Sequence, residues 1–176
     1  MFSLRRRLFI AGLLVAGVTL VVLSVPAAVT TSHAQGCSNV ITGTPGDDFL
    51  VGTNGPDCIY AGDGNDTIIG LGGNDVIYAG PGDDYVDAFG GHDTVFGEAG
   101  NDFLRGAEDG DTVFGGPGDD VLNGQFDNPS QTSSTNDELF GNEGNDVLEG
   151  GAGLDSCNGG SGIDTSSGCE FLTLIP

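Results

Sequence analysis

Aspartate recurs at every ninth residue through most of the chain. Thirteen consecutive units, one of them lengthened by eight extra residues, carry aspartate at their sixth position. These residues are Asp48, Asp57, Asp66, Asp75, Asp84, Asp93, Asp102, Asp111, Asp120, Asp137, Asp146, Asp155 and Asp164. Carboxylates that repeat so regularly offer hard oxygen ligands, and when they are stacked closely they repel one another unless a cation lies between them. The pattern therefore favours binding of a divalent cation.

The rest of the unit indicates how these aspartates are positioned. Position four is glycine except at Asp109 and in the interrupted unit, and glycine supplies turn conformations that other residues avoid. Position eight is aliphatic in the first eleven units: Leu50, Ile59, Ile68, Ile77, Val86, Val95, Leu104, Val113, Leu122, Leu139 and Leu148. A three-residue strand over positions seven to nine would point this side chain inward and its two neighbours outward. Positions one to six then reverse the chain, so two units complete one coil of a solenoid.

This unit resembles the repeats-in-toxin (RTX), or haemolysin-type, calcium-binding repeat, Gly-Gly-x-Gly-x-Asp-x-aliphatic-x, over residues 43–167. The resemblance implies an all-β fold: a parallel β-roll, or right-handed β-solenoid, of two short sheets with calcium ions in its turns. It also implies that the thirteen aspartates are metal ligands and that adjacent coils share each ion. Calcium suits such turns because it takes six to eight oxygen ligands at flexible angles, whereas magnesium demands a tighter octahedron. We expect empty or distorted sites where Asp109 replaces glycine and near the insertion at Asp137.

Stacked coils turn the eighteen-residue period into rows. Asp48, Asp66, Asp84, Asp102 and Asp120 would line one edge, and Asp57, Asp75, Asp93 and Asp111 the other. Position nine gives an aromatic row on one sheet, namely Tyr60, Tyr78, Phe96, Phe114 and Phe140. Position seven gives Phe49, Thr67, Tyr85, Phe103 and Val121 on the other sheet. Such rows either brace the sheet by stacking or form a contact face, and the sequence leaves both interpretations open.

The charge balance narrows the class of partner. The chain has 26 acidic and four basic residues, and beyond residue 35 Arg105 alone opposes all 26 acids, which leaves −25. Nucleic acid and anionic membranes are therefore excluded as expected partners, and cations are favoured, because an uncompensated charge of this size opposes compaction. An acidic disordered tail has a similar composition, and the strict period argues against it.

The first 34 residues have the layout of a secretory signal: Arg5, Arg6 and Arg7, an apolar run, and small residues before a cleavage site after Ala34. An uncleaved membrane anchor is the alternative, because the apolar run is long. Either way the remainder would lie outside the cytoplasm, secreted or at the cell surface, and free of the membrane once cleaved. We assign 35–42 to an N-terminal half repeat or cap, 43–167 to the roll with a loop insertion near 125–135, and 168–176 to a C-terminal cap.

Export permits disulfide bonds between the four cysteines. They form two pairs along the sequence, Cys37 with Cys58 and Cys157 with Cys169. Three connectivities are possible, and proximity favours local pairing at each end. Because the terminal repeats of a solenoid lack one neighbour, we expect each pair to close one end of the roll.

No catalytic motif occurs outside or within the repeats. The chain has no His-Glu-x-x-His and no Gly-x-Ser-x-Gly sequence, and we expect no enzymatic activity. The expected function is that of a secreted calcium-binding repeat protein, folded and stiffened by calcium, with a structural or cell-envelope role. The alternative is an extracellular adhesion module in which the aromatic rows bind a polysaccharide or another cell-surface ligand and calcium serves as scaffold.

Overall fold

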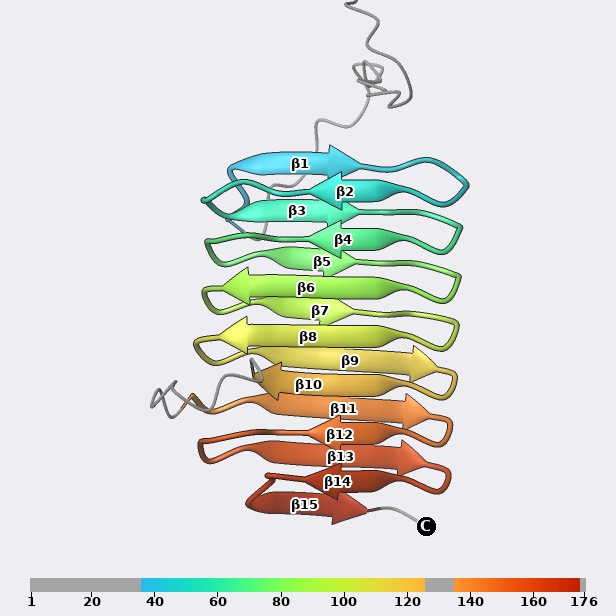
Figure 1. The fold of residues 1–176 in the computed structure, drawn as a ribbon, viewed down its shortest axis with the longest axis vertical. Coiled ribbons are helices and arrows are strands. Elements are labelled where there is room, and N and C mark those ends of the chain that lie inside the picture. Colours follow the sequence, from blue (N-terminus) through green and yellow to red (C-terminus); the bar gives the residue numbers. More distant parts are fainter. Residues whose placement is uncertain (1–35, 126–134, 175–176) are drawn as a thin grey trace, which may run out of the picture. The chain divides into compact units, whose positions relative to one another are not determined.

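The structure is a computed structural model that describes residues 36–125 and 135–174. The proposed signal or anchor at 1–34, most of the insertion and the last two residues lie outside the described residues. Regular secondary structure in the described part consists of fifteen β-strands in two parallel sheets (Figure 1). None of the described residues forms a helix with the length and apolar character needed to cross a membrane.

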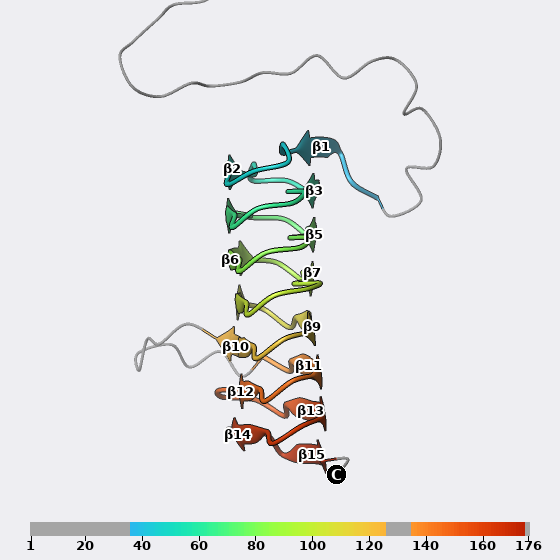
Figure 2. The same ribbon diagram turned by 90° about the vertical axis from the view of Figure 1, so that its right-hand side faces the viewer.

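The odd-numbered strands form an eight-stranded sheet and the even-numbered strands a seven-stranded sheet. The first sheet contains β1 (Asn39–Thr42), β3 (Asp57–Tyr60), β5 (Val76–Tyr78), β7 (Thr94–Phe96), β9 (Thr112–Pro117), β11 (Glu138–Glu143), β13 (Ser156–Ser161) and β15 (Phe171–Leu174). The second contains β2 (Phe49–Val51), β4 (Thr67–Ile69), β6 (Tyr85–Gly90), β8 (Phe103–Glu108), β10 (Val121–Gln125), β12 (Val147–Glu149) and β14 (Thr165–Ser167). The chain alternates between the sheets, so each pair of units makes one coil (Figure 2).

Strand pairing confirms the predicted eighteen-residue coil. Ile59 lies beside Ile77, and Ile77 beside Val95, in consecutive odd strands. The same offset joins the even strands, as in the pair Val86 and Leu104. The predicted parallel β-roll of two sheets is therefore the fold of the described residues. Several strands are longer than the three residues predicted: β6, β8, β9, β11 and β13 each have six, because positions one to three of the next unit continue the strand.

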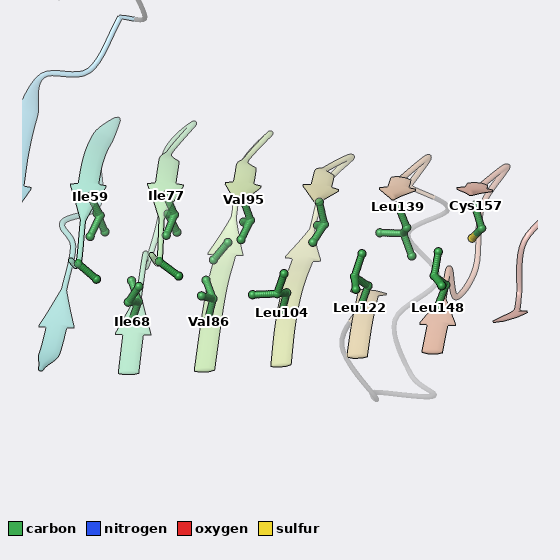
Figure 3. Close-up of a cluster of buried hydrophobic side chains, with 14 residues drawn as sticks. Ile59, Ile68, Ile77, Val86, Val95, Leu104, Leu122, Leu139, Leu148 and Cys157 are labelled. Carbon is green, nitrogen blue, oxygen red and sulfur yellow. The ribbon is translucent and has the colours of Figure 1, made fainter. Parts of the chain in front are cut away.

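The core is one row of side chains from each sheet, directed toward one another. The position-eight residues from Ile59 to Leu148 are at most 1% exposed, and Cys157 continues the row where the aliphatic residues end (Figure 3). Alanines at position one, Ala61, Ala79 and Ala88, are also completely buried. Leu50 and Ile41 in the first coil pack against this core and are only partly buried. The prediction that position eight points inward is confirmed.

Most turns have left-handed backbone at two positions of the unit. Position four has φ of 145° at Gly82, where an added Cβ would collide with the carbonyl oxygen of Gly64. Asp109 occupies the same position with φ of 70°, so a residue with a Cβ does enter this turn, at some cost in backbone strain. Position two is left-handed as well, at Leu71 and Phe89 for example, which the sequence did not indicate.

The strand pairing keeps the same register before and after the insertion. β11 pairs with β9, and β12 with β10, at an offset of 26 residues, which is one coil plus the eight extra residues. Phe140 consequently lies beside Phe114 in the same sheet, as predicted.

Disulfide bonds join Cys37 to Cys58 and Cys157 to Cys169, which confirms the local pairing. No cysteine is left free. The first bond ties the segment before β1 to β3, and the second ties β13 to the segment before β15. Each bond lies in the outermost coils of the roll, and its capping role stays a prediction.

Candidate metal sites in the turns

The position-six aspartates line the two edges of the roll in hydrogen-bonded rows. Oδ1 of each aspartate accepts the backbone N–H of the aspartate one coil earlier; Asp84 N–H, for example, donates to Asp102 at 2.9 Å. One row runs Asp48, Asp66, Asp84, Asp102, Asp120, Asp146 and Asp164. The other runs Asp57, Asp75, Asp93, Asp111, Asp137 and Asp155. These are the two rows that the eighteen-residue period predicts, continued past the insertion.

The second carboxylate oxygen is buried without a partner in ten of these residues. Within the described residues, Oδ2 has no hydrogen bond in Asp66, Asp75, Asp84, Asp93, Asp102, Asp111, Asp120, Asp137, Asp146 and Asp155. A buried charged oxygen without a partner is costly, on the order of 1–3 kcal/mol or more for each group. Repetition of this cost in ten successive turns, from Asp66 to Asp155, indicates that these turns are built to bind a cation.

Burial raises the pKa of these carboxyl groups, and the neighbouring aspartates raise it further. The pKa reaches about 6 for Asp75, Asp84 and Asp120, about 7 for Asp93, Asp102 and Asp137, and about 9 for Asp111. In each case desolvation is the largest cause, and the N–H bond from the preceding coil partly opposes it. A cation in the turn would reverse this effect by favouring the ionised form.

Backbone oxygens converge on the same turns. A Cβ on Gly70, at position one, would lie 2.6 Å from the carbonyl oxygen of Ala88 in the next coil and 2.7 Å from Oδ2 of Asp75. Glycine therefore leaves open a space that a carboxylate and a carbonyl oxygen both face. Within the described part of the chain, no three His, Cys, Asp or Glu side chains cluster in a way that could hold a metal ion. In the turn of Gly70, the ligands that face the open space are carboxylate and carbonyl oxygens. An all-oxygen set of this kind suits calcium.

Comparison with known families agrees with this geometry. Residues 42–77, 69–104, 105–128 and 131–165 match the RTX calcium-binding nonapeptide repeat, in four copies. The chain belongs to this family. It is a calcium-binding repeat protein, and RTX repeats bind calcium in their turns. A search of curated proteins found no match. The unpartnered Oδ2 atoms and the carbonyl oxygens beside them fit the ion, and the aspartates that carry them would hold it.

The thirteen candidate aspartates fall into three groups in this RTX roll. Ten have the unpartnered oxygen, including Asp111 beside Asp109 and Asp137 after the insertion, and the expectation of empty or distorted sites at these two places stays a prediction. The carboxylates of Asp48 and Asp57 instead accept hydrogen bonds from threonines in their own turns. Asp164, in the last complete unit, is only partly buried.

Position five carries a second ladder that the sequence analysis missed. Along one edge Asp47, Asn65, Asp83, Asn101, Asp119 and Asn145 alternate, and each side-chain oxygen accepts the N–H of position five in the next coil at 2.8–3.0 Å. Along consecutive units, nine residues apart, asparagine at position five shows no regular pattern. In every second unit, eighteen residues apart, it alternates with aspartate along this edge.

The end of one aspartate row was also missed. Oε2 of Glu170 accepts the N–H of Asp155 at 2.8 Å and so closes the row. Glu170 lies fifteen residues after Asp155 and therefore falls outside the eighteen-residue period that located the other acids.

The aromatic row lies on the outer face of the odd-numbered sheet. Consecutive rings of Tyr60, Tyr78, Phe96, Phe114 and Phe140 stack with centroids 4.8–5.1 Å apart and planes within 11° of parallel. Each inner ring therefore covers its neighbours' faces and presents its edge outward. This arrangement favours the interpretation that the row braces the sheet.

Proposed function

We propose that this protein is an exported structural module that calcium folds and stiffens, with a role outside the cell or in the cell envelope. The observation that carries the proposal is the double row of ten buried carboxylate oxygens without partners. The position-six aspartates would serve as ligands, together with the backbone carbonyls that face them.

The physical argument is that the metal-free roll has little to hold it together. Its core contains about one aliphatic side chain per nine-residue unit, and ordering each residue costs about 1–2 kcal/mol of backbone entropy. The net charge of −25 beyond residue 35 adds repulsion that a row of divalent ions would offset. Binding of calcium would therefore supply folding free energy, as metal binding does in other small metal-dependent domains.

Export is supported by the sequence of residues 1–34 and by the family, whose members are typically secreted. We propose the same division as before: a signal at 1–34, a half repeat at 35–42, the roll at 43–167 and a cap at 168–176. An RTX repeat is a structural calcium-binding fold, and we propose no catalytic activity for the chain. Adhesion to a polysaccharide or cell-surface ligand is the weaker candidate, because the stacked rings of the aromatic row cover one another's faces.

The test is a calcium titration followed by far-ultraviolet circular dichroism and calorimetry. We expect β-structure to form as calcium approaches the range of extracellular sites, about 10⁻⁴–10⁻³ M, and equimolar magnesium to act far more weakly. Two neighbouring residues provide matched variants. Asp84→Asn removes a buried position-six carboxylate and should weaken calcium binding strongly. Asp83→Asn removes an exposed position-five charge that acts on the site only through space, and it should weaken binding far less. A protein that is fully β-structured in excess chelator would contradict the proposal.

A further inference from the structure

The first coil differs from all the others in what its aspartates bind. Thr44 donates both its backbone N–H, at 2.5 Å, and its hydroxyl, at 3.0 Å, to Oδ2 of Asp48. Thr53 makes the same two bonds to Oδ2 of Asp57, at 2.5 and 3.0 Å. Asp57 is 0% exposed and Asp48 is partly buried, so water replaces these donors poorly at Asp57 in particular. The oxygen that lacks a partner in ten later turns therefore has two in each of these.

The backbone of these two turns differs as well. At position two, Gly62 and Gly80 have φ of 113° and 109°, and their N–H groups donate across the coils to Ala79 and Gly97. Thr44 and Thr53 hold the same position without a positive φ, and their N–H groups turn back to their own aspartates. A β-branched residue is strained in the left-handed region, so threonine at position two selects the alternative turn.

Location at the end of the solenoid gives this exchange a reason. An ion shared between coils takes ligands from both sides. The strand after Asp48, β2, is the edge strand of its sheet, and β3 has beyond it only β1, where Asn39 stands beside Asp57 in place of an aspartate. Local hydrogen bonds from position two to position six need no neighbouring coil. The Cys37–Cys58 bond ties the same coil to the segment before β1 and adds a covalent link at this end of the roll.

We propose that Thr44 and Thr53 take the place of calcium in the first coil, so that Asp48 and Asp57 are not metal ligands and the bound aspartates begin with Asp66 and Asp75. This inference rests on the proposed calcium-dependent function, and it converts two of the thirteen repeat units into a metal-independent N-terminal cap.

Two double variants of the full chain test the assignment by the amount of calcium bound at saturation. Asp48→Asn with Asp57→Asn should leave the amount unchanged, whereas Asp66→Asn with Asp75→Asn should lower it. Thr44→Gly with Thr53→Gly restores the family residue at position two, and it should raise the amount bound. An equal loss of calcium in the two aspartate pairs would overturn the inference.

A second measurement separates this inference from the proposed function. In the folded protein, the amide hydrogens of Thr44 and Thr53 should exchange slowly with solvent, and Asp48→Ala with Asp57→Ala should remove that protection. If these amides exchange freely in the unaltered protein, the inference is wrong whatever calcium does. If these amides are protected but no form of the chain binds calcium, the proposed function is wrong, while the hydrogen bonds from Thr44 and Thr53 to Asp48 and Asp57 are confirmed.

Discussion

Acid and calcium should stabilise the roll through the same carboxyl groups. The ordinary pKa of aspartate is 3.8, and burial raises it to about 6 for Asp84, about 7 for Asp93 and about 9 for Asp111 in the metal-free fold. The folded state therefore binds more protons than the unfolded chain between these values. It follows that the stabilisation is complete below about pH 4 and is lost as the pH rises through 6 to 9. In chelator, the chain should be more ordered at pH 5 than at pH 8.

The size of the effect on calcium follows from proton competition. Asp111, with a pKa of about 9, is about 99% protonated at pH 7. Because a bound calcium ion must displace this proton, the apparent calcium affinity at that site is about a hundredfold lower at pH 7 than above pH 9. Asp93, Asp102 and Asp137 have pKa values of about 7. For each of these protons that calcium displaces, the apparent affinity should fall about tenfold with each pH unit below 7. Apparent calcium affinity should therefore rise steeply from pH 6 to pH 8.

The assay is the calcium concentration at half-maximal ellipticity, measured at pH 6, 7 and 8. Asp93→Asn with Asp111→Asn should flatten the pH dependence, because these variants remove two of the raised groups. The control, Asp63→Asn with Glu143→Gln, removes two exposed charges at position three and should leave the slope nearly unchanged. A midpoint that does not move between pH 6 and pH 8, or a chelated chain that gains structure as the pH rises, would refute the reasoning.

Three further outcomes are expected. Deleting the eight surplus residues of the insertion should preserve calcium-dependent thermal unfolding or raise the free energy of unfolding by about 0.5 kcal/mol, because closing the longer loop costs entropy. Loss of the cooperative unfolding transition would show that the strand register across the insertion is wrong. Asp109→Gly should raise stability by about 1 kcal/mol by relieving left-handed strain, whereas Gly82→Ala should lower it by at least about 2 kcal/mol; equal effects of the two in denaturant titrations would contradict the account of position four. Cys157→Ser with Cys169→Ser should cost about 2–3 kcal/mol in the same titrations and increase amide exchange chiefly in β13 and β15, and uniform exchange along the roll would argue against a cap.

Features carried by residue type at a fixed spacing could be predicted. Position eight predicted the core, and position six predicted the two rows of aspartates. An apolar side chain at the first and a carboxylate at the second are required in nearly every unit, and few residue types meet either requirement. The offset of 26 residues across the insertion also followed, since Asp137 and Phe140 resume their roles after it.

Features carried by backbone conformation could not be predicted. Position two holds residues as different as Leu71, Phe89 and Glu98, all left-handed, so no residue type reveals the requirement. Thr44 and Thr53 occupy the same position, and their residue type alone gave no reason to assign them a role. Their role depends on where the N–H of position two points, which a sequence pattern does not contain.

The arrangement of charge explains why calcium dependence belongs to position six rather than to the whole acidic surface. Along the edge that carries the position-five ladder, asparagine separates successive aspartates, so like charges there lie two strand spacings apart, about 9–10 Å. That distance exceeds the Debye length of about 8 Å at physiological ionic strength, and salt screens most of the repulsion. Position-six carboxylates lie one spacing apart, about 4.8 Å, and are buried from salt. In the turns that lack a threonine donor, a bound cation or a proton relieves the repulsion. For Asp75, Asp84 and Asp120, with pKa values of about 6, the cation must do so near neutral pH.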